Sequence, residues 1–149
     1  MNTPALVFGN DVTALGTLRS LQARDIPTMV ASPSPAAEQF SRWFVEAPAP
    51  TPAADPDALA RYLDAHVQEG TVLFPTSDRY ALALARLPSS VQERWPTVAA
   101  RAEALELLVD KALFAGVLEG LEVPHPMTRP VDGVEAMAAL DPARLEGCF

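Results

Sequence analysis

The sequence predicts an α/β protein with a parallel sheet. Three short apolar runs, at residues 5–9, 28–31 and 71–74, have the composition of strands that are buried on both faces. Segments with a helical spacing of apolar residues separate these runs, at residues 14–24 and 57–68. Strands that alternate with helices are typical of a three-layer α/β fold, in which helices cover both faces of one sheet.

Composition indicates a folded protein with no nucleic-acid or membrane partner. Of the 149 residues, 49% are hydrophobic and 20% are charged, which are the proportions of a soluble globular chain. The formal net charge of -8 disfavours nucleic acid and anionic membranes, since both require clustered lysine and arginine. The N-terminus lacks the cationic start and long apolar run of a signal peptide, so we expect a cytoplasmic location.

The first three elements form one βαβ unit. The run 5–9 ends in Gly9, and residues 10–13 supply the polar side chains that begin a helix. Helix 14–24 has to end before Pro27, after which the second strand begins. A strand, a helix and a parallel strand within about 30 residues make a right-handed crossover, the start of a Rossmann-like doubly wound sheet.

The rest of the chain continues the alternation and then becomes mainly helical. Residues 41–46 indicate a short helical or extended piece joined to a brief strand, and the Pro- and Ala-rich residues 47–56 indicate a surface connection. The later elements that we expect are a helix over 57–68, a strand over 71–74, a helix over 79–87 capped by Ser77 or Asp78, a short strand over 97–99, helical structure from 101 with a break near 109–110, a strand over 127–131 and a helix from Asp132 to Leu140.

A ligand site is expected just past the first strand. Gly9, Asn10 and Asp11 lie at its carboxyl end, where open α/β sheets bind ligands and a helix begins with free N–H groups. The pattern is no dinucleotide fingerprint, because Asp11 occupies the second glycine position and its carboxylate would repel a pyrophosphate. The second strand also ends at Ala31 and Ser32 rather than at an acidic residue for a ribose. NAD and FAD are therefore not expected, and a tight turn with a helix cap explains these residues equally well.

Two further segments carry groups that could contact a small polar substrate. Past the third main strand, Ser77, Asp78 and Arg79 offer a hydroxyl, a carboxylate and a guanidinium, although the first two can equally serve as a helix cap. Before the brief strand, Ser41 and Arg42 precede a tryptophan. Arg42 could bind a substrate carboxylate through two nitrogens, or pack on that aromatic ring at the surface.

Lys111 is the only lysine of the chain, and it begins an apolar helical stretch. Asp110 precedes it, and about ten residues later the segment from Gly120 to Pro126, Gly-Leu-Glu-Val-Pro-His-Pro, must end that helix. This composite resembles the entry to the ATP-grasp fold, where an Asp-Lys pair opens a helix and a Gly-x-x-Val-Pro-x-Pro turn closes it. The Pro-Thr-Ser-Asp and Ser-Arg-Trp segments also resemble parts of ATP-grasp ligases related to the carbamoyl phosphate synthetase large chain and D-aspartate ligase.

The resemblance implies that residues 1–100 form a pre-ATP-grasp domain and that residues 101–149 hold a linker helix and the incomplete start of the ATP-grasp region. It implies that Lys111 binds ATP phosphates, with Mg²⁺ as the metal, and that the substrates are a small-molecule carboxylate and an amine, such as amino acids or peptides. In such ligases ATP phosphorylates the carboxylate to an acylphosphate, which the amine attacks. A second lysine and the magnesium ligands would lie beyond Phe149. We therefore expect a fragment that is inactive alone and whose partner is the remainder of the ATP-grasp domain.

Two alternatives from other classes stay open. The chain could be a non-catalytic Rossmann-like binding domain, with Asp110 and Lys111 in a plain linker helix, or a dimerisation domain that forms a homodimer. No catalytic residue or metal site is predicted within the chain. His66 and His125 have no metal-ligand spacing with each other or with the single cysteine, Cys148.

Overall fold

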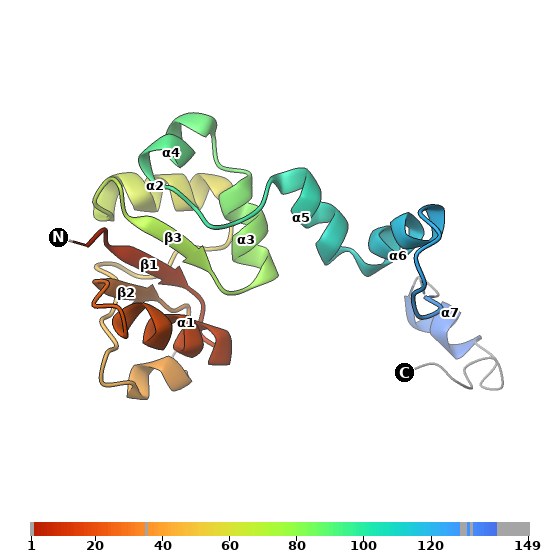
Figure 1. Ribbon diagram of the computed structural model, residues 1–149, viewed down its shortest axis with the longest axis horizontal. Helices are drawn as coiled ribbons and strands as arrows, with labels where there is room; N and C mark the ends of the chain where they lie inside the picture. Colours follow the sequence, from red (N-terminus) through yellow and green to blue (C-terminus); the bar gives the residue numbers. More distant parts are fainter. Residues whose placement is uncertain (1, 35, 129–130, 132, 140–149) are drawn as a thin grey trace. The chain divides into compact units, whose positions relative to one another are not determined.

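A computed structural model describes residues 2–34, 36–128, 131 and 133–139 of the chain (Figure 1). The chain divides into two compact units, Met1–Leu105 and Glu106–Phe149. The first unit contains the sheet, and its fold is α/β. In the described residues of the second unit the only regular elements are helices.

Three parallel strands form the sheet of the described residues, in the order β2-β1-β3. They are β1 (Ala5–Phe8), β2 (Thr28–Ala31) and β3 (Val72–Pro75). The predicted α/β class with a parallel sheet is therefore confirmed, and the open sheet is compatible with a Rossmann-like fold. In the register of the sheet Phe8 lies opposite both Ala31 and Pro75, so the carboxyl ends of all three strands lie at one edge.

Side chains of the central strand alternate between two hydrophobic cores. Val7 packs with Val30 against α1 (Val12–Gln22), whose Ala14 and Leu18 are fully buried. Leu6 and Phe8 belong to the core on the opposite face. Because every residue of β1 is buried, the strand is apolar throughout, as strands covered on both faces are.

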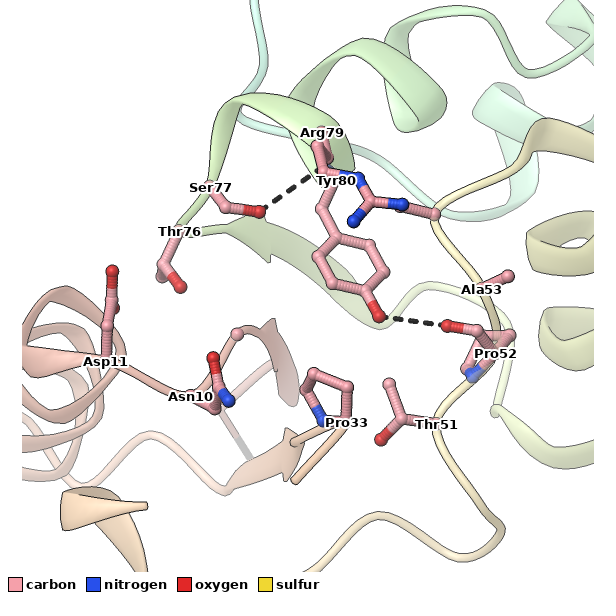
Figure 2. A pocket seen from close by; sticks show the side chains of 12 residues that line it. Asn10, Asp11, Pro33, Thr51, Pro52, Ala53, Thr76, Ser77, Arg79 and Tyr80 are labelled. Atoms are coloured by element: carbon pink, nitrogen blue, oxygen red, sulfur yellow. Dashed lines mark hydrogen bonds between the residues drawn. The ribbon is translucent and has the colours of Figure 1, made fainter. Parts of the chain in front are cut away.

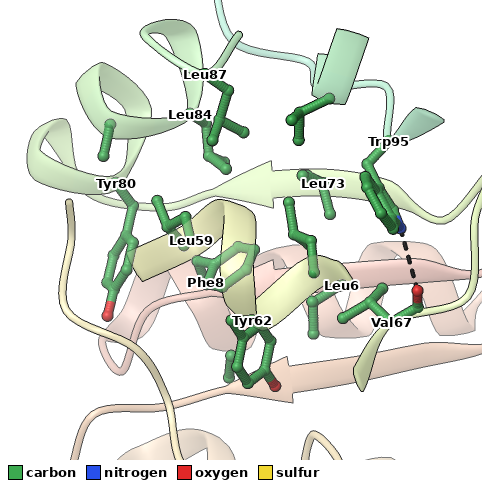
Figure 3. Packing of buried hydrophobic residues seen from close by; sticks show 14 of the residues in the cluster. Leu6, Phe8, Leu59, Tyr62, Val67, Leu73, Tyr80, Leu84, Leu87 and Trp95 are labelled. Atoms are coloured by element: carbon green, nitrogen blue, oxygen red, sulfur yellow. Dashed lines mark hydrogen bonds between the residues drawn. The ribbon is translucent and has the colours of Figure 1, made fainter. Parts of the chain in front are cut away.

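Helices α2 (Pro56–His66), α3 (Asp78–Ala85) and α4 (Ser89–Arg94) lie on the opposite face of the sheet from α1 (Figure 1). Their core includes Leu59, Leu84 and Trp95 (Figure 3). The indole N–H of Trp95 lies within hydrogen-bond distance of the carbonyls of Val67 (3.3 Å) and Gln68 (3.1 Å), which ties the chain after α4 to the end of α2. Helix α4 was not predicted, because its six residues are mostly polar.

The two brief strands that were predicted, one joined to residues 41–46 and one over 97–99, are each reduced to a single parallel bridge. Glu46 pairs with Val30 of β2, and Thr97 pairs with Leu73 of β3. The Thr97 bridge does not extend toward its N-terminal side, since Pro96 precedes it and proline has no N–H to donate to the ladder. A 3₁₀ helix, η1 (Ala37–Phe40), precedes the first bridge and was not predicted.

The second unit begins within α5 (Ala102–Val109) and continues through α6 (Lys111–Gly120) and α7 (Gly133–Ala138). The predicted break lies at Asp110, whose Oδ1 accepts hydrogen bonds from the backbone N–H groups of Ala112 (2.9 Å) and Leu113 (3.1 Å). Asp110 therefore caps α6.

The strand predicted over 127–131 is wrong where the structure describes it. Met127, Thr128 and Val131 are in no strand, and residues 129–130 lie outside the described residues. A segment whose residues favour an extended backbone does not form a strand by itself, because its backbone N–H and C=O groups need a neighbouring strand to pair with. The predicted cap Asp132, the predicted helix end Leu140 and Cys148 also lie outside the described residues. No helix within the described ranges is long and apolar enough to cross a membrane.

Candidate functional site

A cavity of about 360 Å³ opens at the carboxyl ends of β1 and β3 (Figure 2). The chain leaves β1 toward β2 on one side and returns with β3 on the other, so this is the point where the strand order reverses. Such switch points are where open α/β sheets bind ligands. The cavity lining consists of Gly9 to Asp11, Pro33, Thr51 to Ala54, Thr76, Ser77, Arg79 and Tyr80.

The floor of this cavity depends on Gly9. Its φ is +149°, a conformation that favours glycine, and a Cβ at this position would lie 1.9 Å from Thr76 Oγ1. The Thr76 hydroxyl and backbone N–H both donate to the carbonyl of Phe8, each at 3.0 Å. Gly9 is therefore required for the close approach of the chain after β1 to the chain after β3.

Two helices begin at the cavity, each with a polar cap. Asp11 caps α1 by accepting a hydrogen bond from the N–H of Ala14 at 2.9 Å. Ser77, one of the two predicted caps, accepts a longer hydrogen bond from the N–H of Tyr80 at 3.5 Å and caps α3. Helix N-termini favour anions. The Arg79 guanidinium adds positive charge to the lining and the Asp11 carboxylate adds negative charge, so the cavity offers partners to a small molecule that carries both signs.

One wall of the cavity is the Pro-rich segment between β2 and α2. The Tyr80 hydroxyl donates a hydrogen bond to the carbonyl of Pro52 at 2.9 Å, which holds the segment Thr51 to Ala54 at the cavity (Figure 2). The ring of Tyr80 stacks on Phe8 with 5.3 Å between centroids. Burial raises the pKa of the Tyr80 hydroxyl, and the nearby Arg79 charge opposes this in part.

The structure brings together five of the predicted site residues. Gly9, Asn10, Asp11, Ser77 and Arg79 all line the cavity, although the two groups are more than 60 residues apart in sequence. Parallel pairing of β1 with β3 accounts for this, since both groups directly follow the ends of paired strands.

Three other predicted residues do not line the cavity. Asp78 is the exposed first residue of α3. Ser41 and Arg42 lie in the turn after η1, where the Arg42 guanidinium stacks over the Trp43 ring at 4.4 Å from its centroid. This is the surface packing that was the alternative to carboxylate binding for Arg42.

The prediction missed the wall formed by Thr51 to Ala54, and also Pro33, Thr76 and Tyr80. The wall was predicted to be a surface connection. No local signal identifies it, because its attachment depends on Tyr80, 28 residues further along the chain.

Lys111 lies in the second unit as the exposed first residue of α6. Its Nζ donates a hydrogen bond to the carbonyl of Leu108 at 3.3 Å, at the end of α5. An ammonium group has three N–H bonds, so two are left for other acceptors.

No metal centre is evident in the described part of the chain, where no group of three or more histidine, cysteine or acidic side chains is placed to hold an ion. Comparisons of the chain with protein-family models, with curated proteins and with solved structures find no match.

Proposed function

We propose that this chain is the amino-terminal part of an ATP-grasp carboxylate-amine ligase, and that the cavity beside β1 and β3 forms one wall of its substrate pocket. The observation that carries the proposal is the cavity itself, at a strand-order switch point, with two helix N-termini, the Arg79 guanidinium and the Asp11 carboxylate in its lining. The Asp110-capped helix that begins with Lys111 supports it, since the family resemblance rests on that dipeptide.

Each unit has a proposed role of its own. In the first unit, Arg79 and the N-terminus of α3 bind and orient the substrate carboxylate, while Asp11, which already caps α1, accepts a hydrogen bond from an amine or hydroxyl. In the second unit, the exposed ammonium of Lys111 retains N–H donors for phosphate oxygens. When bound with Mg²⁺, ATP supplies the phosphoryl group that activates the carboxylate for attack by the amine. We assign no described residue of this chain as a ligand of Mg²⁺. The cellular location that we propose is the cytoplasm.

Carboxylate binding is tested by titrating the 149-residue chain with a panel of amino acids and following backbone amides by NMR. We expect shifts at residues 9–11 and 76–80. Arg79→Gln should weaken the binding about tenfold or more, because a charged hydrogen bond contributes about 1.5–3 kcal/mol. Arg61→Gln, on the exposed side of α2 and outside the cavity lining, is the matched control. Shifts confined to other residues, or equal effects of the two substitutions, would contradict the proposed pocket.

Ligase activity is tested separately, by ADP formation in the protein expressed from its complete reading frame. We expect activity with an amino-acid pair and its loss in Lys111→Ala, whereas the 149-residue chain alone should release no ADP. Release of ADP by the 149-residue chain alone would overturn the proposal that the second lysine and the magnesium ligands belong to the remainder of the ATP-grasp domain.

The alternatives are a binding domain without catalysis and a dimerisation domain. The cavity favours the binding domain, because ligand binding in the cavity needs no contribution from Lys111. Ligand binding without ADP formation by the protein from the complete reading frame would establish this alternative. The second is a homodimer through α6 and its C-cap, where Leu113, Val117 and the C-cap residue Leu121 are 55%, 36% and 68% exposed at a spacing of four residues. A monomer in sedimentation at high concentration would eliminate the homodimer.

A further inference from the structure

Glu38 is a buried carboxyl group that contacts the chain just after β2. It lies in η1 and is 0% exposed. Its Oε1 is 2.7 Å from the hydroxyl oxygen of Ser32, the residue that directly follows β2. Its Oε2 is also buried and has no hydrogen-bond partner among the described residues. Burying an oxygen without a partner is costly, so the favourable polar contact of this side chain is the one with Ser32.

The Ser32 contact continues by hydrogen bonds to the cavity. The single Ser32 hydroxyl proton is shared with a second acceptor, the carbonyl of Ser34, which lies 2.6 Å from the Ser32 oxygen, so one three-centre hydrogen bond joins Glu38 to the short turn around Pro33. The Ser34 hydroxyl in turn accepts a hydrogen bond from Nδ2 of Asn10 at 2.7 Å. Asn10 and Pro33 both line the cavity, on the same side of it in Figure 2. A connected set of polar groups therefore runs from the buried carboxyl to the pocket.

The last bond of this set decides which end of the Asn10 amide is available to a ligand. An amide group has donors on its nitrogen and an acceptor at its oxygen. Because Ser34 accepts from Nδ2, Oδ1 of Asn10 is left as an acceptor beside Asp11. Two neighbouring acceptors suit an ammonium or hydroxyl group of a bound molecule.

We propose that Glu38 is a positioning residue of the pocket, which acts through Ser32 and Ser34 to hold the Asn10 amide with its oxygen available to a ligand amine or hydroxyl. The inference deepens the proposed function and rests on it for the identity of the ligand. The positioning itself is a property of the unliganded chain. It can therefore be tested, and can fail, independently of any binding result.

The side-chain NH₂ signals of Asn10 in a ¹⁵N–¹H NMR spectrum report the hydrogen bond directly. Glutamine side chains give NH₂ signals in the same region, so the spectra of Asn10→Ala and Asn2→Ala together assign the two asparagine pairs. Asn2, which bonds to the carbonyls of Arg24 and Asp25, is an internal reference. Ser34→Ala removes the Asn10 bond and gives the signal position of the released amide. Glu38→Ala and Ser32→Ala should shift the Asn10 signals toward that position.

Glu38→Gln should restore the Asn10 signals to near the wild-type position, because its side-chain oxygen can still accept from Ser32. Thr71→Val is the matched control: it removes one buried hydroxyl bond, to the carbonyl of Gln68 at 2.7 Å, before the start of β3 and so at the opposite edge of the sheet. It should leave the Asn10 signals in place.

If Glu38→Ala does not fold, Ser32→Ala still decides the question, because it interrupts the same set of bonds and keeps the carboxyl. Wild-type Asn10 signals in folded Ser32→Ala would overturn the proposal. So would a Glu38→Gln spectrum that matches Ser34→Ala. Movement of the Asn2 signals together with those of Asn10 would indicate a general structural effect and would likewise refute the positioning role.

Discussion

Among glycine-to-alanine substitutions at the described glycines of the first unit, Gly9→Ala should lower the free energy of unfolding the most. The new Cβ would lie 1.9 Å from Thr76 Oγ1, far inside van der Waals contact, and 3.3 Å from Thr76 Cβ, a tight contact. The backbone φ of +149° is in addition a conformation that side chains other than glycine's rarely adopt. The substitution therefore adds backbone strain and displaces the threonine.

The expected cost combines two terms. Holding a non-glycine residue in this backbone region costs about 1–3 kcal/mol. Displacing the Thr76 hydroxyl breaks its 3.0 Å bond to the carbonyl of Phe8, which contributes about 1 kcal/mol. Gly9→Ala should therefore lower the free energy of unfolding by about 2–4 kcal/mol. In a Thr76→Ala background the second term is already lost, so the same change should cost about 1 kcal/mol less.

Urea unfolding of the two single variants, the double variant and the wild type measures both quantities, with the tryptophan fluorescence of Trp43 and the buried Trp95 as the signal. Gly16→Ala is the control, because it lies within α1 with no atom within 4 Å of the added methyl group, and it should stabilise by about 0.5–1 kcal/mol. A Gly9→Ala cost that is identical in both backgrounds would refute the contact with Thr76. A variant as stable as the wild type would refute the backbone argument as well.

Three further predictions concern Tyr80, Trp95 and Asp110. Burial raises the pKa of the Tyr80 hydroxyl above 10.0. The stabilisation that the neutral hydroxyl gives the folded state is therefore complete below the unfolded pKa and is lost as the pH rises through the folded pKa. Above about pH 10 the free energy of unfolding should fall less in Tyr80→Phe than in the wild type, and identical pH profiles would contradict this. Trp95→Ala should cost about 3–5 kcal/mol in urea unfolding, because it empties a fully buried site, and a cost below about 1 kcal/mol would exclude that burial. Asp110→Ala should speed hydrogen exchange of the Ala112 and Leu113 amides about fivefold, since an N-cap contributes about 1 kcal/mol, and unchanged exchange would argue against the cap.

Much of the first unit could be predicted from local sequence. The runs that became β1, β2 and β3 are short and apolar, and Pro27 marks the end of the connection before β2. Such features act within a few residues, so they are visible without knowing what the segment packs against. The elements that were missed or wrong, such as α4 and the strand expected over 127–131, depend on a partner elsewhere in the chain.

The candidate site divides in the same way. Gly9 to Asp11 and Ser77 were predicted because a turn and a helix cap after a strand are local patterns. The wall held by Tyr80, and the buried carboxyl of Glu38 behind Asn10, could not be predicted, since a tyrosine on a helix and a glutamate among alanines give no sign of a distant partner.

The sequence by itself indicated the three strands of the sheet, the approximate starts of α1, α2 and α3, and the glycine turn after the first strand. The tertiary structure decided which of the candidate residues share a cavity. It did so through the parallel register that places Phe8 opposite Pro75, and so sets the residues after both strands side by side. Local preferences arise from each residue and its immediate neighbours, whereas the cavity arises from pairing between strands more than 60 residues apart, which burial of both faces of the sheet stabilises.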